Sequence, residues 1–155
     1  MRLVVYLEPD PGRKRELQQQ LTALLPAWFG QAASNAKYAQ QAEVLEGYVA
    51  ELDGVRSGLL LLKKSSSRSA EIYWMGVDPS CHRLGIGRAL IAAVEAAARS
   101  TGVVYLFVAT LHPDDPYEPY QRTRKFYQAM GFEYVLEEQF PADPDNVVAY
   151  FLKHL

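Results

Sequence analysis

The sequence predicts a mixed α/β fold in a single domain. Two observations lead to this prediction: segments with strand patterns alternate with segments of helical periodicity, in the order β-α-(α)-β-β-β-α-β-α-β, and an Asp-Gly turn joins two of the strands. The chain has 155 residues, 49% hydrophobic and 22% charged, which is enough for one sizeable core. We therefore expect one domain over residues 1–155.

The N-terminal third begins with a strand at residues 2–8, which Pro9 closes. A helix is expected from Gly12 to Leu25, because four leucines follow the i, i+4, i+7, i+8 spacing of one helical face. Pro26 ends or kinks that helix. Residues 34–42 are expected to form a second, looser helix.

The middle of the chain contains a hairpin and the longest helix. Residues 47–52 and 55–62 flank Asp53-Gly54, a pair that readily adopts the positive φ angles of a tight turn. A polar loop leads to a strand at residues 71–77. A helix follows at residues 87–100, with an apolar stripe on one face, and Gly102 stands where a left-handed cap belongs.

The C-terminal third is expected to contain two strands and a helix. Residues 103–109 are nearly all apolar, which is typical of a strand buried on both faces. A loop rich in Pro and Asp covers residues 111–119. The last helix is expected over residues 121–130 and a terminal strand over residues 147–152.

The junction from Val77 to Leu90 carries the strongest functional signal. A strand enters it, a Pro-marked turn follows, and Gly85 and Gly87 open a helix, so bare N–H groups and the positive end of a helix dipole meet at one place. This predicts an anion site and a phosphate-bearing ligand. A P-loop is excluded because Arg88-Ala89 replaces Lys-Ser/Thr. A dinucleotide fingerprint fits poorly because Leu90 replaces the third Gly or Ala.

Two motifs resemble those of the GCN5-related N-acetyltransferases (GNAT family). His82-Arg83-Leu84-Gly85-Ile86-Gly87 is similar to the family's coenzyme A diphosphate loop, Gln/Arg-x-x-Gly-x-Gly/Ala, in all but its first position. Phe126-Tyr127-Gln128-Ala129-Met130-Gly131-Phe132 resembles the Phe-Tyr-x-x-x-Gly-Phe end of the family's C-terminal helix. The resemblance covers about residues 43–136. It implies a mixed central sheet with splayed parallel strands flanked by helices, and transfer of an acetyl group from acetyl-CoA to an amine without a metal.

The resemblance also implies which residues bind the coenzyme. Main-chain atoms of Met75 and Val77 would contact the pantetheine and the thioester. The diphosphate would lie on the loop formed by His82, Arg83, Leu84, Gly85, Ile86, Gly87 and Arg88. The glycines let phosphates approach the backbone, and the arginines add positive charge. His82 replaces the usual Gln or Arg, and is either a ligand or an exposed turn residue.

The resemblance makes Tyr127 the general acid that faces the leaving sulfur, although its helical spacing also suits core packing. Glu71 lies on the strand before the loop, and it is the first candidate for the base, acting through water. Weaker candidates are Glu43, Glu46, Tyr120 and His112. Cys81 would permit an acetyl-cysteine route, but no base stands beside it, so direct transfer in a ternary complex is expected.

The acceptor is expected to be a small-molecule or peptide amine. The acidic residues of the C-terminal third favour a cationic amine, and Trp28, Phe29, Tyr117 and Tyr120 either wall the acceptor pocket or belong to the core. Two alternatives stay open: a non-catalytic acyl-CoA-binding module of the same fold, and a nucleotide-binding domain of another kind.

Composition limits the partners. The net charge is −2 and the basic residues are scattered, which argues against nucleic-acid binding. The leucines of residues 59–62 are too few for a membrane span, and the N-terminal apolar run is too short for a signal peptide. One cysteine fits a reducing compartment. We therefore expect a cytoplasmic protein, and a homodimer stays open.

Overall fold

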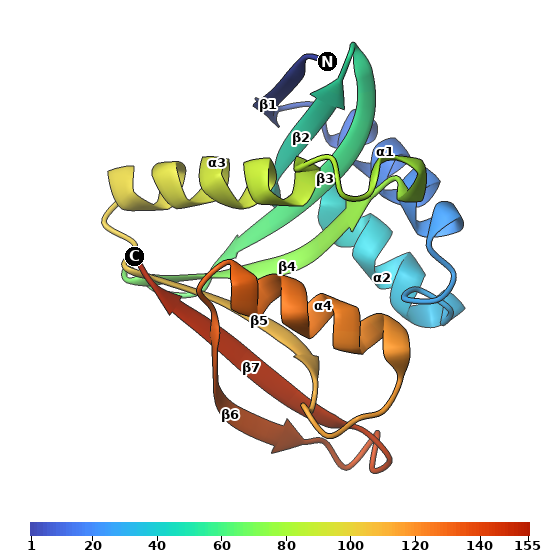
Figure 1. Ribbon diagram of the computed structural model, residues 1–155, viewed down its shortest axis with the longest axis vertical. Coiled ribbons are helices and arrows are strands. Elements are labelled where there is room, and N and C mark those ends of the chain that lie inside the picture. Colours follow the sequence, from blue (N-terminus) through green and yellow to red (C-terminus); the bar gives the residue numbers. More distant parts are fainter.

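The computed structural model describes residues 1–155 and contains one seven-stranded sheet in the order β1-β2-β3-β4-β5-β7-β6. Helices α3 and α4 cover one face, and α1 and α2 cover the other (Figure 1). The predicted α/β fold is confirmed. The strands are β1 Leu3–Glu8, β2 Glu46–Leu52, β3 Val55–Lys64, β4 Ser69–Val77, β5 Tyr105–Leu111, β6 Glu133–Gln139 and β7 Val147–His154. The helices are α1 Pro11–Leu24, α2 Ala32–Ala42, the 3₁₀ turn η1 Pro79–Cys81, α3 Ile86–Ser100 and α4 Glu118–Ala129.

Strands β4 and β5 are the only parallel neighbours in the sheet, and they pair over a short distance. Residues 69–71 of β4 face residues 105–107 of β5, and no further pairing follows along either strand. From Ile72 to Val77, β4 keeps only its antiparallel partner β3. The two strands therefore open a gap in the middle of the sheet, which confirms the expected splay.

A β-bulge in β4 changes which side chains point to which face. Leu62 lies opposite Ile72 and Leu61 lies opposite Trp74, so Tyr73 is an extra residue on β4. Ile72 belongs to the core beneath α3 and α4, whereas Trp74 belongs to the core beneath α1 and α2. The bulge thus brings aromatic side chains of β4 to the α1/α2 face beside the gap.

Helix boundaries follow local chemistry more than apolar periodicity. The Asp10 carboxylate accepts the Arg13 N–H at 2.9 Å and caps α1, which begins one residue before the predicted start. Helix α4 begins at Glu118, three residues early, because the proline at 119 fits the first turn, where no N–H is needed. Gly102 has φ +82°, the left-handed conformation predicted for it.

Two predictions for the C-terminal third were wrong. Strand β6 was not predicted, and every one of its residues is exposed, so no apolar alternation marks it. Strand β5 begins at Tyr105, and its residues alternate between buried and partly or fully exposed; it is therefore not buried on both faces. No helix is long and apolar enough to cross a membrane.

Candidate active site

One cavity of about 770 Å³ reaches both faces of the sheet at the gap between β4 and β5. We call the part on the α3/α4 face, lined by residues 82–83 and 85–88, Met75, Val77 and Tyr127, the loop chamber. We call the part on the α1/α2 face the aromatic chamber; its walls include Trp28, Phe29, Tyr38, Tyr73, Trp74 and Tyr120. The splayed strands therefore join two differently built halves into one space.

The backbone of the loop chamber leaves a run of donors free. Arg83 and Gly85 both adopt positive φ angles, +66° and +84°, which turn the chain sharply into α3. The first hydrogen bond at this helix end runs from the Ala89 N–H to the Gly85 carbonyl at 3.0 Å. The main-chain N–H groups of residues 83–88 donate to no other group of the protein. These free donors lie at the positive end of a 15-residue helix, an arrangement that attracts anions.

The charge of the cavity wall has one sign. Four basic side chains line it, Arg83, Arg88, Arg122 and Lys125, and no Asp or Glu does. The wall therefore has a positive charge, which attracts negatively charged groups. Leu84 is 41% exposed and does not line the cavity.

His82 lies at the mouth of the loop chamber. Its Nε2 is 3.0 Å from the Val77 carbonyl oxygen, and its ring meets the Trp28 ring edge-on at 6.4 Å. The Asp78 N–H of the same peptide donates to the Ser57 carbonyl on β3, so the Val77 carbonyl points the other way, into the gap. His82 therefore covers a strand-edge carbonyl that would otherwise be open.

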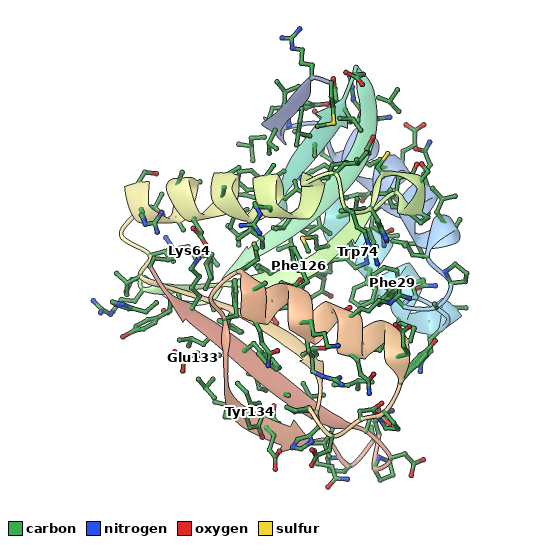
Figure 2. The ribbon with its side chains drawn as sticks, viewed as in Figure 1. Phe29, Lys64, Trp74, Phe126, Glu133 and Tyr134 are labelled. Carbon is green, nitrogen blue, oxygen red and sulfur yellow. The ribbon has the colours of Figure 1, made fainter.

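Helix α4 packs directly on the start of α3. A Cβ built on Gly87 would lie 3.0 Å from the Phe126 ring, and Phe126 lies between the two helices (Figure 2). A side chain at residue 87 would require the Phe126 ring to shift by a few tenths of an ångström. The second glycine of the motif therefore allows close packing of α4 on the start of α3.

Tyr127 packs in the core and also lines the cavity, so its place is compatible with either interpretation offered by the sequence. It packs between Phe126 and Phe132, with ring centroids 5.2 and 5.4 Å away, and it also lines the cavity. It is 4% exposed, and burial raises the pKa of its phenol well above the usual value. The hydroxyl is therefore protonated at neutral pH and serves as a hydrogen-bond donor.

Glu71 is half-buried on β4, in the short parallel segment. Burial raises the pKa of its carboxyl, and the opposite charge of Lys63 lowers it in part. Glu71 does not line the cavity, but it lies near the aromatic chamber: burial raises the pKa values of Tyr38 and Tyr73, and the charge of Glu71 adds to this effect. Any proton that it accepts from the cavity must pass through water or a hydroxyl.

The other candidates are placed less favourably. Glu43 pairs with Arg15 at 3.1 Å, and neither Glu43 nor Glu46 lines the cavity. His112 binds Glu137 at 2.7 Å, also outside the cavity. Cys81 and Tyr120 do line it. The nearest polar partner of the Cys81 thiol is the Ser80 hydroxyl at 3.7 Å, which is no base.

The aromatic chamber was only partly anticipated from the sequence. Of the expected wall residues, Trp28, Phe29 and Tyr120 line the cavity, whereas Tyr117 does not. The sequence analysis missed Tyr73 and Trp74, because the bulge in β4 that selects their face leaves no mark in the sequence, and it missed Tyr38, which α2 brings to the same face. Phe29 stacks on Trp74 at 5.1 Å, and these two side chains lie next to each other in Figure 2.

The acidic side chains of the C-terminal third do not line the cavity. The cavity walls therefore do not support the expectation, drawn from these residues, that the acceptor is a cationic amine. The side chains concerned are Asp114, Asp115, Glu118, Glu137, Glu138, Asp143 and Asp145. Side chains of His, Cys, Asp and Glu do not gather anywhere in groups of three or more that could hold a metal ion.

Comparison with known proteins decides the family. The model of the acetyltransferase (GNAT) domain matches residues 44–134. The chain belongs to the GNAT acetyltransferase family. The matched segment includes the gap in the sheet, the loop and Tyr127, so the predicted family is confirmed. No curated protein is significantly similar to this acetyltransferase in sequence.

Solved structures share the whole fold at low sequence identity. A GNAT-family protein from Desulfovibrio desulfuricans has a TM-score of 0.83 and 20% identity, covering 99% of both chains. A GNAT acetyltransferase from Elizabethkingia anophelis with acetyl-CoA bound has a TM-score of 0.67 and 16% identity, covering 99% of this chain and 98% of that one. An aminoglycoside 6'-N-acetyltransferase complexed with coenzyme A has a TM-score of 0.69 and 18% identity, covering 99% and 97%.

Proposed function

We propose that this GNAT acetyltransferase moves an acetyl group from acetyl-CoA to the primary amine of a small-molecule or peptide acceptor, by direct transfer in a ternary complex. One observation carries the proposal: the free main-chain N–H groups of residues 83–88 open into the same cavity as Tyr127. These donors suit a diphosphate, and the cavity leads from them to a buried hydroxyl.

The loop chamber fits coenzyme A in charge and in polarity. The free N–H groups would bind the diphosphate, and Arg83 and Arg88 would neutralise its charge. Beyond the loop, Met75 and Val77 line a largely apolar passage suited to pantetheine. A pantetheine amide that bonded to the Val77 carbonyl would have to displace His82 from it. Two of the solved structures with this fold hold acetyl-CoA or coenzyme A, which supports the same ligand here.

Acetyl transfer needs a deprotonated amine and a stabilised leaving sulfur. A C–N bond forms at the thioester carbonyl while the C–S bond breaks. The Glu71 carboxylate would take the amine's proton through water, and the main chain of Met75 would polarise the carbonyl. The Tyr127 hydroxyl would donate a hydrogen bond to the departing sulfur. Because a thiol titrates near ~8.5 and burial raises the pKa of Tyr127, full proton transfer would be uphill, but a hydrogen bond suffices.

The test uses the full chain, calorimetry with coenzyme A, and thiol release from acetyl-CoA across a panel of primary amines. We expect binding of the coenzyme, and release of the thiol only when an amine is present. Coenzyme binding without release by any amine would favour the non-catalytic module. No heat and no thermal shift with millimolar coenzyme A would overturn the proposal, as would tighter binding of ATP or an adenine dinucleotide.

A single substitution tests the direct route. Cys81→Ala should keep normal turnover, because the thiol has no base beside it. Loss of turnover in a folded Cys81→Ala protein that still binds coenzyme A would instead indicate an acetyl-cysteine intermediate.

A further inference from the structure

The walls of the aromatic chamber are ring faces and ring edges. Phe29 stacks on Trp74 at 5.1 Å with an interplanar angle of 27°, and meets Tyr38 edge-on at 6.3 Å. Tyr38 in turn meets Tyr73 edge-on at 5.6 Å. Aromatic side chains attract a flat guest through offset stacking and edge-to-face contacts. The chamber is therefore complementary to an aromatic body.

No carboxylate is free to bind a second positive charge on the acceptor. None lines the cavity, and those nearby have partners. Glu118 pairs with Arg122 at 2.7 Å, and the Asp115 carboxylate accepts the Tyr117 N–H at 2.9 Å. Glu71 faces Lys63 across the strands. An additional ammonium group would lose its water without gaining a counter-charge, which is costly.

The segment between α1 and α2 forms one wall of the aromatic chamber. The Tyr117 hydroxyl donates to the Ala27 carbonyl at 2.6 Å, and the Tyr120 hydroxyl donates to the Trp28 carbonyl at 3.1 Å. The Trp28 indole N–H donates to the Thr123 hydroxyl at 3.0 Å. The same indole N–H also donates to the Pro119 carbonyl at 3.1 Å, so four hydrogen bonds tie this segment to α4 and its N-cap residue. These bonds hold the segment in place as one wall of the chamber.

Polar groups suited to a single amine lie at the β4 side of the chamber. Tyr38 and Tyr73 line the cavity, and their phenols are protonated at neutral pH because burial, and to a smaller extent the charge of Glu71, raises their pKa values. They can donate to or accept from one amino group. Glu71 lies behind them as the group that accepts its proton.

We propose that the acceptor is a compact arylalkylamine that carries one amino group, with its aromatic ring packed against the cluster of Phe29, Tyr38 and Trp74 that lines the cavity. This inference rests on the proposed function and narrows it to a substrate class. It sets polyamines, aminoglycosides and protein lysines aside as acceptors.

Binding can be measured independently of turnover. The chain has two tryptophans, Trp28 and Trp74, and both line the cavity, so their fluorescence reports on this site. The full chain, saturated with coenzyme A, is titrated with 2-phenylethylamine, spermidine and kanamycin. We expect half-saturation with 2-phenylethylamine at a concentration at least tenfold below that of either polycation. The order of kcat/KM with acetyl-CoA should be the same.

Variants locate the ring. Phe29→Ala should raise the half-saturation concentration of 2-phenylethylamine at least fivefold and leave the dissociation constant of coenzyme A unchanged. Phe29→Leu, which keeps most of the volume, replaces it if the alanine variant fails to fold. Phe140→Ala is the matched control, because Phe140 is an exposed phenylalanine outside the cavity.

The outcomes separate the two proposals. Binding of 2-phenylethylamine without thiol release from any amine would support the ligand class and overturn the transfer. Equal or tighter binding of spermidine or kanamycin, together with turnover of either, would overturn the ligand class and leave acetyl transfer standing. Phe29 variants that bind 2-phenylethylamine like the wild type would also overturn the ligand class.

Discussion

The two chambers of the cavity differ in the groups that form their walls: main-chain groups in one and side chains in the other. The loop chamber presents main-chain N–H groups from residues 83–88. The aromatic chamber presents side chains from four separate segments: the α1–α2 connection, α2, the bulged strand β4 and α4. A backbone site survives many substitutions, whereas a side-chain site changes with each one. The difference explains how one fold can keep its donor while its acceptors diverge.

The largest expected effect concerns Glu71, the proposed base near the aromatic chamber. Glu71→Gln should lower kcat/KM by about 100-fold, the range typical of a lost general base. In the wild type, kcat/KM should rise with pH through the pKa of Glu71, which burial raises above its usual value. The variant should lose this limb. Glu46→Gln, outside the cavity, is the control.

The same variant should gain stability while it loses activity. Because the pKa of Glu71 is raised in the folded chain, the folded state binds its proton more tightly than the unfolded state does. The free energy of unfolding should therefore fall as the pH rises from the pKa of Glu71 in the unfolded chain to its pKa in the folded chain. Glu71→Gln cannot ionise, so it should melt higher than the wild type at pH 7. A lower melting temperature would mean that Glu71 stabilises the fold.

The next effect concerns the hydroxyl at the end of the loop chamber. Tyr127→Phe keeps the ring packed between Phe126 and Phe132 and removes only the donor. Turnover should fall at least about tenfold with an unchanged dissociation constant for coenzyme A, since the hydrogen bond forms in the transition state. Tyr134→Phe, at an exposed position on β6, is the control. Unchanged turnover would remove Tyr127 from the mechanism.

Substitutions at Gly85 and Gly54 test the binding function of the loop separately from its backbone strain. Gly85 and Gly54 have φ angles of +84° and +82°, and a Cβ would meet nothing within 4 Å at either. Alanine at either residue should cost about 1 kcal/mol of stability, measured by urea unfolding. Only Gly85→Ala should weaken coenzyme A binding, by several-fold in calorimetry. Equal coenzyme affinities would argue against an anion site at the loop.

The smallest effect concerns Trp28, in the segment between α1 and α2 that lines the aromatic chamber. Trp28→Phe keeps an aromatic ring but removes the indole N–H that donates to Thr123 and to the Pro119 carbonyl. The loss should be about 1 kcal/mol in stability, typical of one net hydrogen bond. The KM of the acceptor should rise and the KM of acetyl-CoA should stay unchanged. A change in the KM of acetyl-CoA alone would place Trp28 in the donor site instead.

The same difference decides what can be predicted from sequence. The hairpin at Asp53-Gly54 and the cap at Gly102 were predicted because positive φ angles demand particular residues nearby in the chain. The loop at residues 83–88 was found for the same reason. Tyr38 and Trp74 were missed because their meeting depends on a bulge and on helix packing between distant segments. Strand β6 was missed because neither of its faces is buried.

The three-residue pairing of β4 with β5 leaves part of a sheet without its ladder. Between Ile72 and Val77, the peptide groups on the β5 side of β4 have no neighbouring strand to bond to. One of them, the Val77 carbonyl, is covered by the imidazole of His82. A bound molecule with amides of its own would act there as a missing strand. At a ligand concentration 100 times the dissociation constant, binding would add about 2.7 kcal/mol to the free energy of unfolding. Cellular coenzyme levels would then govern the lifetime of this enzyme as well as its rate.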